Sequence, residues 1–313
     1  MSSFIIIASI GYVLLAAVAI LDKFILTKEL QVSTYTFYST IFFFAALLLY
    51  PFSEPVSFNG FLWALGSGLG FGFATWAMFL ALKRGAATHV VPFIGAVAAI
   101  FVYGFSFIVL GDALSLLQTA GIVMLVSASL LFSYDTEHAK RKKVVGKQSL
   151  HPAFGWALLS GFLYAVSHVA SKHFYGDYSF VTGLVWAQGS VGIVAFFTLF
   201  SAVTRRNIFK DIFEKKVHHD AHGEMHNGHH HGIVFADKAL GLAGTLAIQY
   251  AIATGSVAVV TGLVGLQYAL IMIFAGISTL FAPQFFKEYF SKKEVVLKIL
   301  AIILVVVGIT LLA

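Results

Sequence analysis

ALKRGAATHVVPFIG, residues 81–95, aligns without a gap with AIATGSVAVVTGLVG, residues 251–265, at a constant offset of 170 positions. Each stretch covers the end of one apolar block, a glycine and the start of the next block, and glycine is the residue for which a non-helical turn costs least. A looser match pairs YVLLAAVAILDKF near the start of the chain with FLYAVSHVASKHF, so that Lys23 and Lys172 both follow an apolar block. The identical pairs in the first match are Ala81 and Ala251, Gly85 and Gly255, Val90 and Val260, and Gly95 and Gly265.

The composition around these stretches is that of an integral membrane protein. Of 313 residues, 59% are hydrophobic and 11% are charged, and the mean hydropathy is +0.90. A helix needs about 20 apolar residues to cross a hydrocarbon core of about 30 Å, and the blocks lack the alternation of barrel strands. We therefore predict an all-α polytopic membrane protein with ten transmembrane helices. The predicted spans are 4–22, 34–51, 60–82, 88–110, 114–133, 153–171, 180–203, 237–254, 257–281 and 295–313.

The internal similarity predicts that five spans are repeated as five spans. An odd number of crossings per unit places the two units in opposite orientations, which is the inverted-repeat construction of secondary transporters. The first repeat covers residues 1–133, a basic loop covers 134–152, and the second repeat covers 153–313 with a His-rich loop at 204–236. The alternative is a chance agreement between two helices rich in Ala, Val and Gly.

The positive charges predict the orientation in the membrane. Of the 20 Lys and Arg residues, all but Lys172 lie on or beside the odd-numbered loops, and basic loops favour the cytoplasmic side. Both termini are then expected outside the cell membrane, with the first apolar block as a span and not a cleaved signal peptide. The basic run at 140–143 is typical of a segment that binds anionic lipid headgroups, and we expect no nucleic-acid partner.

Three segments resemble the EamA-like branch of the drug/metabolite transporter superfamily. They are ALKRGAATHVVPF at the start of the fourth span, GDALSLLQTAG at 111–121, and KKEVVLKILAIILVVVGITLL at 292–312, with Glu294 in the acidic position and Gly308 late in the helix. The resemblance covers nearly the whole chain outside the His-rich loop and implies a five-plus-five helix architecture. Members of that family commonly place both termini in the cytoplasm, whereas the charges here predict the reverse, and we follow the charges.

Polar and aromatic residues inside the spans are the candidate substrate-binding residues, because a polar group in a membrane is costly without a partner or a cavity. Several have a simpler interpretation. GSGLGFGF at 66–73 is typical of close helix packing, Trp76 would also suit a lipid-facing position, Thr75 can bond to its own helix, and Lys172 can extend towards headgroups. The candidates are Thr75, Trp76, Gln249, Tyr250, Gln267, Tyr268, Gln188, His168, Lys172 and Lys23.

VHHDAHGEMHNGHHHG, residues 217–232, is a candidate metal-binding segment. Neutral imidazole is a common metal ligand, and Gly223 and Gly228 favour a flexible loop that wraps an ion over a stable helix. We name Zn²⁺ or Ni²⁺ as the ion, and expect that no cofactor is required. The chain has no cysteine, which excludes disulfides and thiolate sites. The candidate ligands are His218, His219, His222, His226, His229, His230 and His231.

These features predict a secondary active transporter, in the exporting direction, of a small organic metabolite such as an amino acid, working by alternating access. The alternative is a divalent transition-metal transporter or a metal-responsive membrane protein that uses the His-rich loop, although the predicted spans carry no carboxylate at mid-depth. An enzyme is not expected, because no nucleophile–base pair or phosphate-binding loop is visible. The expected partners are a small-molecule substrate and the lipid bilayer, for a monomer or homodimer.

Overall fold

The computed structural model describes residues 3–28, 31–111, 114–133, 152–213, 229–281 and 292–312. Within these ranges the chain is helical and forms no strand. The elements of the first half are α1 (Ser3–Lys28), α2 (Val32–Ile41), η1 (Phe42–Phe52), α3 (Phe58–Arg84), α4 (Ala87–Phe105), η2 (Ser106–Leu110) and α5 (Leu116–Ser133). Those of the second half are α7 (Pro152–Asp177), α8 (Phe180–Gly183), η3 (Leu184–Gln188), α9 (Gly189–Val191), α10 (Ile193–Thr198), α11 (Ala202–Phe213), α12 (His229–Thr254), α13 (Val257–Gly262), α14 (Val264–Phe281) and α15 (Lys292–Leu312).

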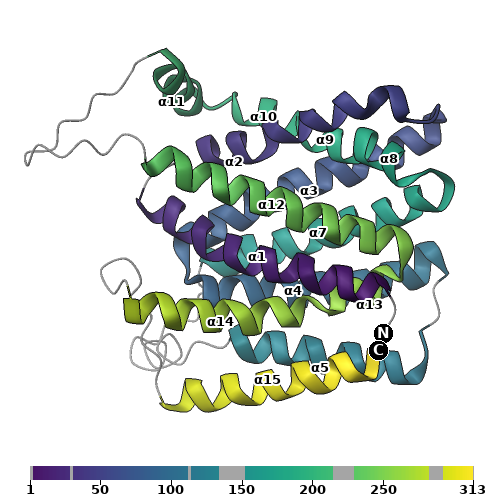
Figure 1. Cartoon of the computed structure of the whole chain (residues 1–313), viewed down its shortest axis with the longest axis vertical. Coiled ribbons are helices and arrows are strands. Elements are labelled where there is room, and N and C mark those ends of the chain that lie inside the picture. The colour runs from purple at the N-terminus through teal and green to yellow at the C-terminus, as the bar shows by residue number, and fades with distance from the viewer. Residues whose placement is uncertain are drawn as a thin grey trace, which may run out of the picture.

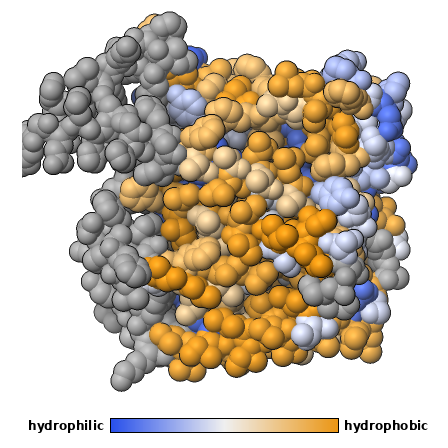
Figure 2. Space-filling view, viewed as in Figure 1, coloured by the Kyte–Doolittle hydropathy of each residue, from blue (hydrophilic) through white to orange (hydrophobic). Residues whose placement is uncertain are grey.

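The all-helical, membrane-compatible fold class predicted from the sequence is confirmed, but the count of ten spans is not. Among the described residues, eight helical stretches are long and apolar enough to cross a membrane. The other two predicted spans correspond to α12, whose apolar sequence is interrupted by Asp237 and Lys238, and to α15, which offers the shorter apolar helix Val295–Leu311. Apolar residues cover most of the face seen in Figure 2, and hydrophilic ones gather towards its edges.

The glycines of the two matched stretches end helices in the same way. The Gly85 amide donates to the Ala81 carbonyl at 3.0 Å, and the Gly255 amide donates to the Ala251 carbonyl at 2.8 Å. In each case the next helix begins two residues after the glycine, with α4 at Ala87 and α13 at Val257. The breaks predicted at both glycines are thus present.

The helices lie roughly side by side, and both ends of the chain are at the same end of the bundle (Figure 1). The pairs with the most extensive contacts are α3 with α7, α1 with α12, α5 with α15, α4 with α7 and α4 with α5, followed by α1 with α14 and α2 with α10. Small residues allow this approach: a Cβ on Gly11 of α1 would lie 3.1 Å from the Gly244 carbonyl oxygen of α12.

The glycines of GSGLGFGF serve mainly in helix packing. A Cβ on Gly68 would lie 2.4 Å from the Ala187 carbonyl oxygen of η3, and one on Gly70 would lie 3.3 Å from the Leu163 carbonyl oxygen of α7. Only short side chains let the backbones approach this closely. The packing interpretation of this stretch is therefore confirmed for α3 against η3 and α7.

Candidate functional site

A network of charged side chains is buried where α1, α2 and α12 meet. It consists of Asp22 from α1, Tyr35 from α2, and Asp237 and Lys238 from α12. The expected span boundaries placed the two aspartates at the edges of the membrane. Because α1 continues to Lys28 and α12 begins at His229, both carboxylates lie inside helices, with Asp237 about 12 Å from the start of α12 at 1.5 Å per residue.

Tyr35 is the centre of the network. Its hydroxyl lies within hydrogen-bond distance of Asp22 Oδ1 and, at 2.8 Å, of Asp237 Oδ2. The ammonium group of Lys238 donates to the same hydroxyl at 2.7 Å. It also pairs with Asp237 Oδ2 at 2.7 Å and with Asp22 Oδ1 at 3.5 Å. One ammonium and one hydroxyl therefore hold two carboxylates together.

The two carboxylates of the network are enclosed by protein. Asp237 is fully buried and Asp22 is 3% exposed. The Lys238 ammonium lies 3.9 Å from the ring centroid of Tyr35 and 5.7 Å from that of Phe79, a buried residue of α3. Asp237 Oδ1 is buried with no hydrogen-bond partner among the described residues. Charges in an apolar environment are costly unless paired, and in membrane helices they mark functional sites.

The two candidate lysines occupy similar positions at the ends of helices. The Lys23 ammonium of α1 donates to the carbonyls of Leu82 at 2.7 Å and Gly85 at 2.9 Å, at the end of α3. The Lys172 ammonium of α7 donates to the Ala253 carbonyl at 3.3 Å, at the end of α12. A cation is favourable at a helix C-terminus, where carbonyls lack partners within the helix. Both lysines thus connect neighbouring helices.

The three candidate glutamines are buried in the helix bundle. Gln249 of α12 accepts a hydrogen bond from the Tyr175 hydroxyl at 3.3 Å, and its Nε2 has no hydrogen-bond partner among the described residues. Gln267 of α14 donates to the Leu15 carbonyl of α1 at 3.2 Å. Gln188 of η3 is also buried, and its Oε1 has no partner within the described ranges. A polar ligand would form hydrogen bonds with the Nε2 of Gln249 and the Oε1 of Gln188.

Thr75 and His168 meet through Tyr164 of α7. The Thr75 hydroxyl donates to the Phe71 carbonyl at 2.9 Å and lies 3.0 Å from the Tyr164 hydroxyl. The His168 ring stacks on the ring of Tyr164, with 6.0 Å between centroids. Buried His168 Nδ1 has no hydrogen-bond partner in the part of the chain that the structure describes.

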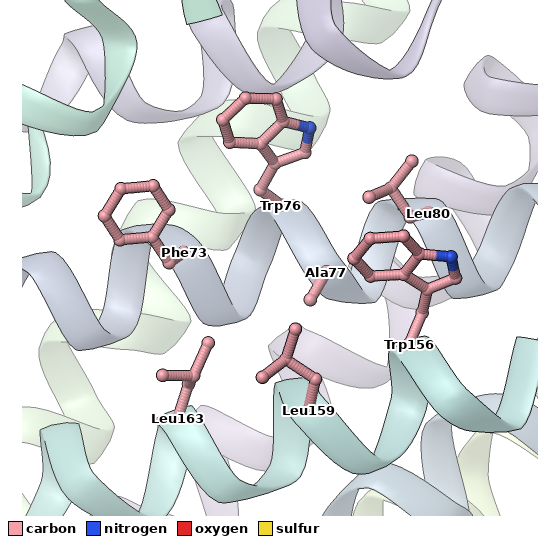
Figure 3. Close-up of a pocket in the computed structure, with 7 residues that line it drawn as sticks. All are labelled: Phe73, Trp76, Ala77, Leu80, Trp156, Leu159 and Leu163. Carbon is pink, nitrogen blue, oxygen red and sulfur yellow. The ribbon is translucent and has the colours of Figure 1, made fainter. Parts of the chain in front are cut away.

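Trp76 lines an apolar cavity of about 360 Å³ between α3 and α7. Figure 3 shows Trp76 on α3 and Trp156 on the neighbouring helix α7. Leu159 of α7, another lining residue, belongs to the exposed large hydrophobic residues. All the lining side chains are aliphatic or aromatic, which suits an apolar occupant. They are Phe73, Trp76, Ala77, Leu80, Trp156, Leu159 and Leu163.

The last two candidates lie in different environments. Tyr250 is 41% exposed and packs its ring against that of Phe180 at 5.2 Å. Tyr268 of α14 is buried against α4, where a Cβ added to Gly95 would lie 1.3 Å from the tyrosine hydroxyl. The glycine at position 95 therefore makes room for Tyr268. The structure brings Tyr268 into the interior and leaves Tyr250 at the surface.

The metal-site prediction falls mostly outside the described residues. His218, His219, His222 and His226 lie in the segment 214–228, which the structure does not describe, and 229–231 begin α12 with side chains that are likewise not described. Within the described ranges, no three His, Asp or Glu side chains are grouped as metal ligands. Zn²⁺ or Ni²⁺ binding by this segment stays a prediction.

Sequence reasoning missed all four members of the network as site residues: Asp22, Tyr35, Asp237 and Lys238. Hydropathy alone ends a span where charges begin, so it placed Asp237 and Lys238 at the membrane edge. Tyr35 had no signal of its own, because one tyrosine among several aromatic residues of 34–51 does not stand out. One signal could have identified Asp237 and Lys238. Apolar residues lie on both sides of them, which allows one continuous helix with the two charges inside it.

No protein-family profile and no curated protein sequence matches this chain. A solved structure titled "Crystal structure of protein" is similar in fold, with a TM-score of 0.62 and 16% sequence identity. The match covers 99% of this chain and 98% of that chain. At this identity the similarity concerns the fold alone, which is therefore found in a known structure over nearly the full length of the chain.

Proposed function

We propose that this protein is a secondary active transporter of a small organic metabolite, of the EamA-like drug/metabolite type, with two five-helix halves that move by alternating access. The observation that carries the proposal is the buried network of Asp22, Tyr35, Asp237 and Lys238. It joins α1 and α2 of the first half to α12 of the second. Charges buried between apolar helices are costly and are a usual mark of a transport pathway.

The helix contacts support two related halves. Exchanging the halves exchanges α1 with α7 and α3 with α12, so the contact of α1 with α12 corresponds to the contact of α7 with α3. Both contacts are among the most extensive in the bundle. Lys23 at the end of α3 and Lys172 at the end of α12 follow the same exchange. An inverted repeat of this kind is typical of transporters that alternate between two related states.

The repeat also relates the charged network to a neutral contact. If Lys23 is set against Lys172, one position away from the end-to-end pairing of the two stretches, Asp22 is set against Ser171, and the offset of 170 aligns Ser67 with Asp237. Ser67 Oγ and Ser171 Oγ lie 2.6 Å apart and are buried. In an inverted repeat, related contacts lie towards opposite ends of the bundle. We infer that the two contacts act as the two gates, one ionic and one neutral.

Several polar groups in the interior of the helix bundle suit an organic substrate. Gln249 and Gln188 have amide atoms without partners among the described residues, and Tyr164 offers a hydroxyl and an aromatic face. Polar groups of this type fix the orientation of a ligand, and apolar walls exclude water. The chemistry fits a small molecule with hydrogen-bonding groups, such as an amino acid.

The test is uptake of a pooled amino-acid and metabolite mixture into proteoliposomes, read by mass spectrometry. The intact chain should accumulate at least one compound above empty liposomes. Asp237→Asn should lose this accumulation, whereas Asp177→Asn, a change at the exposed end of α7, should keep it. Equal accumulation by both variants would refute the role of the network, and no accumulation by the intact chain would refute transport of these compounds.

A further inference from the structure

We propose that Asp22 and Asp237 share one bound proton, and that this proton is the coupling ion of the transport cycle. The inference rests on the proposed function for its second part. Its first part, the proton site, depends only on the contacts of the described side chains. The proton site is formed by Asp22, Tyr35, Asp237 and Lys238, and its charge changes by one when the proton leaves.

The hydrogen bonds at Tyr35 require the proton. The hydroxyl carries one hydrogen, which it can donate to one carboxylate only. It nevertheless lies within hydrogen-bond distance of both Asp22 Oδ1 and Asp237 Oδ2. If both carboxylates were ionised, one of them would meet a lone pair of the hydroxyl oxygen. If one carboxyl is protonated, it donates to the hydroxyl oxygen and the hydroxyl donates to the other.

The balance of charges in the proton site also indicates one bound proton. Two ionised carboxylates and one ammonium leave a net charge of −1 among side chains that are almost fully buried. One proton on the pair makes the site neutral, whereas two protons would leave the Lys238 ammonium without an anion. Buried charges are stable only when they are balanced. One shared proton is therefore the balanced state.

A proton suits the proton site better than a metal ion. The space between the carboxylates is taken by the Lys238 ammonium, 2.7 Å from both Asp237 Oδ2 and the Tyr35 hydroxyl. A bound Na⁺ or divalent ion would need several oxygens around it and would meet the ammonium charge. A proton needs no such shell, because it is held between one carboxyl oxygen and the Tyr35 hydroxyl.

The other polar and charged groups near the proton site are already engaged. Lys23, next to Asp22, donates to the end of α3. The Tyr164 hydroxyl of α7 lies 3.0 Å from the Thr75 hydroxyl. Lys83 at the end of α3 is exposed to solvent. Lys238 is the most accessible member of the proton site, with 15% of its side chain exposed, so the proton enters and leaves on its side.

Loss of the proton couples the charge of the proton site to the contact between α1 and α12. When the protonated carboxyl releases H⁺ to water, it keeps its electron pair, and the site changes from neutral to a charge of −1. The two carboxylates then repel each other across the contact between α1 and α12, and one of them loses its hydrogen bond to Tyr35. The gate between the halves is weakened at the moment when the proton leaves.

The first experiment is infrared spectroscopy of the purified full-length protein, since a protonated carboxyl has its own C=O stretching band. We expect either Asp22→Asn or Asp237→Asn to remove one such band, because the remaining aspartate pairs with Lys238 and needs no proton. Asp177→Asn should keep the band. In the wild-type protein, raising the pH should remove the same band, a test that does not depend on the folding of any variant. A band that survives in both variants, or is lost in only one of them, overturns the shared proton.

The second experiment separates the proton site from the proposed function. Proteoliposomes with the full chain are given a pH gradient or a Na⁺ gradient, and uptake of the pooled metabolites is compared. We expect the pH gradient alone to drive accumulation, and Asp237→Asn to abolish that effect. Accumulation driven by Na⁺, or unaffected by pH, overturns proton coupling but leaves the transporter. If the infrared carboxyl band is present but no compound is transported, the proton site is supported and the proposed function is overturned.

Discussion

Lys238→Met should strongly destabilise the folded protein at pH 7. The change keeps most of the length of the side chain but removes the cation that lies 2.7 Å from Asp237 and 3.5 Å from Asp22. Breaking one partner out of a buried ion pair costs about 3–5 kcal/mol. The variant can avoid an unpaired buried charge by protonating the remaining carboxylate. Protonating an aspartate with an ordinary pKa of about 3.9 costs about 4 kcal/mol at pH 7, at about 1.4 kcal/mol per pH unit. Both routes predict a loss of about 4 kcal/mol.

The pH dependence follows from the same reasoning. The folded variant holds one proton more than the folded wild-type protein, and the unfolded chain releases it at neutral pH, so the free energy of unfolding of the variant should rise more steeply as the pH falls. Between pH 7 and pH 5 the deficit should shrink by about 2–3 kcal/mol. The assay is unfolding in mixed micelles by titration with sodium dodecyl sulfate at both pH values. Lys83→Met, at an exposed lysine of α3, is the matched control. If Lys238→Met were as stable as this control at pH 7, the reasoning on a buried charge network would be refuted.

Three further predictions concern other parts of the molecule. Gly95→Ala should displace Tyr268, whose hydroxyl would lie 1.3 Å from the new Cβ, and should lower the melting temperature of the purified protein. Gly104→Ala on the same helix, where a Cβ would meet no atom within 4 Å, should leave the melting temperature unchanged. Equal melting temperatures for the two variants would contradict the packing. Gln249→Leu should abolish substrate uptake at normal expression, because it removes an amide that has a spare donor, and full uptake would exclude this residue from the pathway. Deletion of residues 218–231 should abolish Zn²⁺ binding in calorimetry without changing metabolite uptake, and unchanged Zn²⁺ binding would contradict the metal prediction.

The parts of the fold that could be predicted are those set by hydrophobicity and by glycine. Apolar blocks of about 20 residues that lack the alternation of barrel strands indicate membrane helices, and the turns at Gly85 and Gly255 were visible as breaks between blocks. The segment 237–254 was harder, because Asp237 and Lys238 lower its hydropathy. Its helix begins earlier, at His229, since the charges find partners in α1 and α2.

The candidate site was only partly predictable for a related reason. Buried amides such as Gln249 and Gln267 stand out within apolar sequence, and both are in the interior. The contact of Asp22 with Asp237 joins residues more than 200 positions apart, and no local pattern encodes it. Tyr35 becomes significant only when α2 places its hydroxyl between the two carboxylates. Such a contact depends on the packing of three helices, which periodicity along one helix does not specify.

The most direct test of the account is a reversible cross-link at the neutral gate. The chain has no cysteine, so Ser67→Cys with Ser171→Cys, at positions whose hydroxyl oxygens are 2.6 Å apart, gives one defined disulfide on a clean background. If the halves alternate between two gates, oxidation should stop metabolite uptake into proteoliposomes, reduction should restore it, and each single-cysteine variant should be insensitive to both. Uptake that continues unchanged in the fully cross-linked protein would contradict alternating access at this contact.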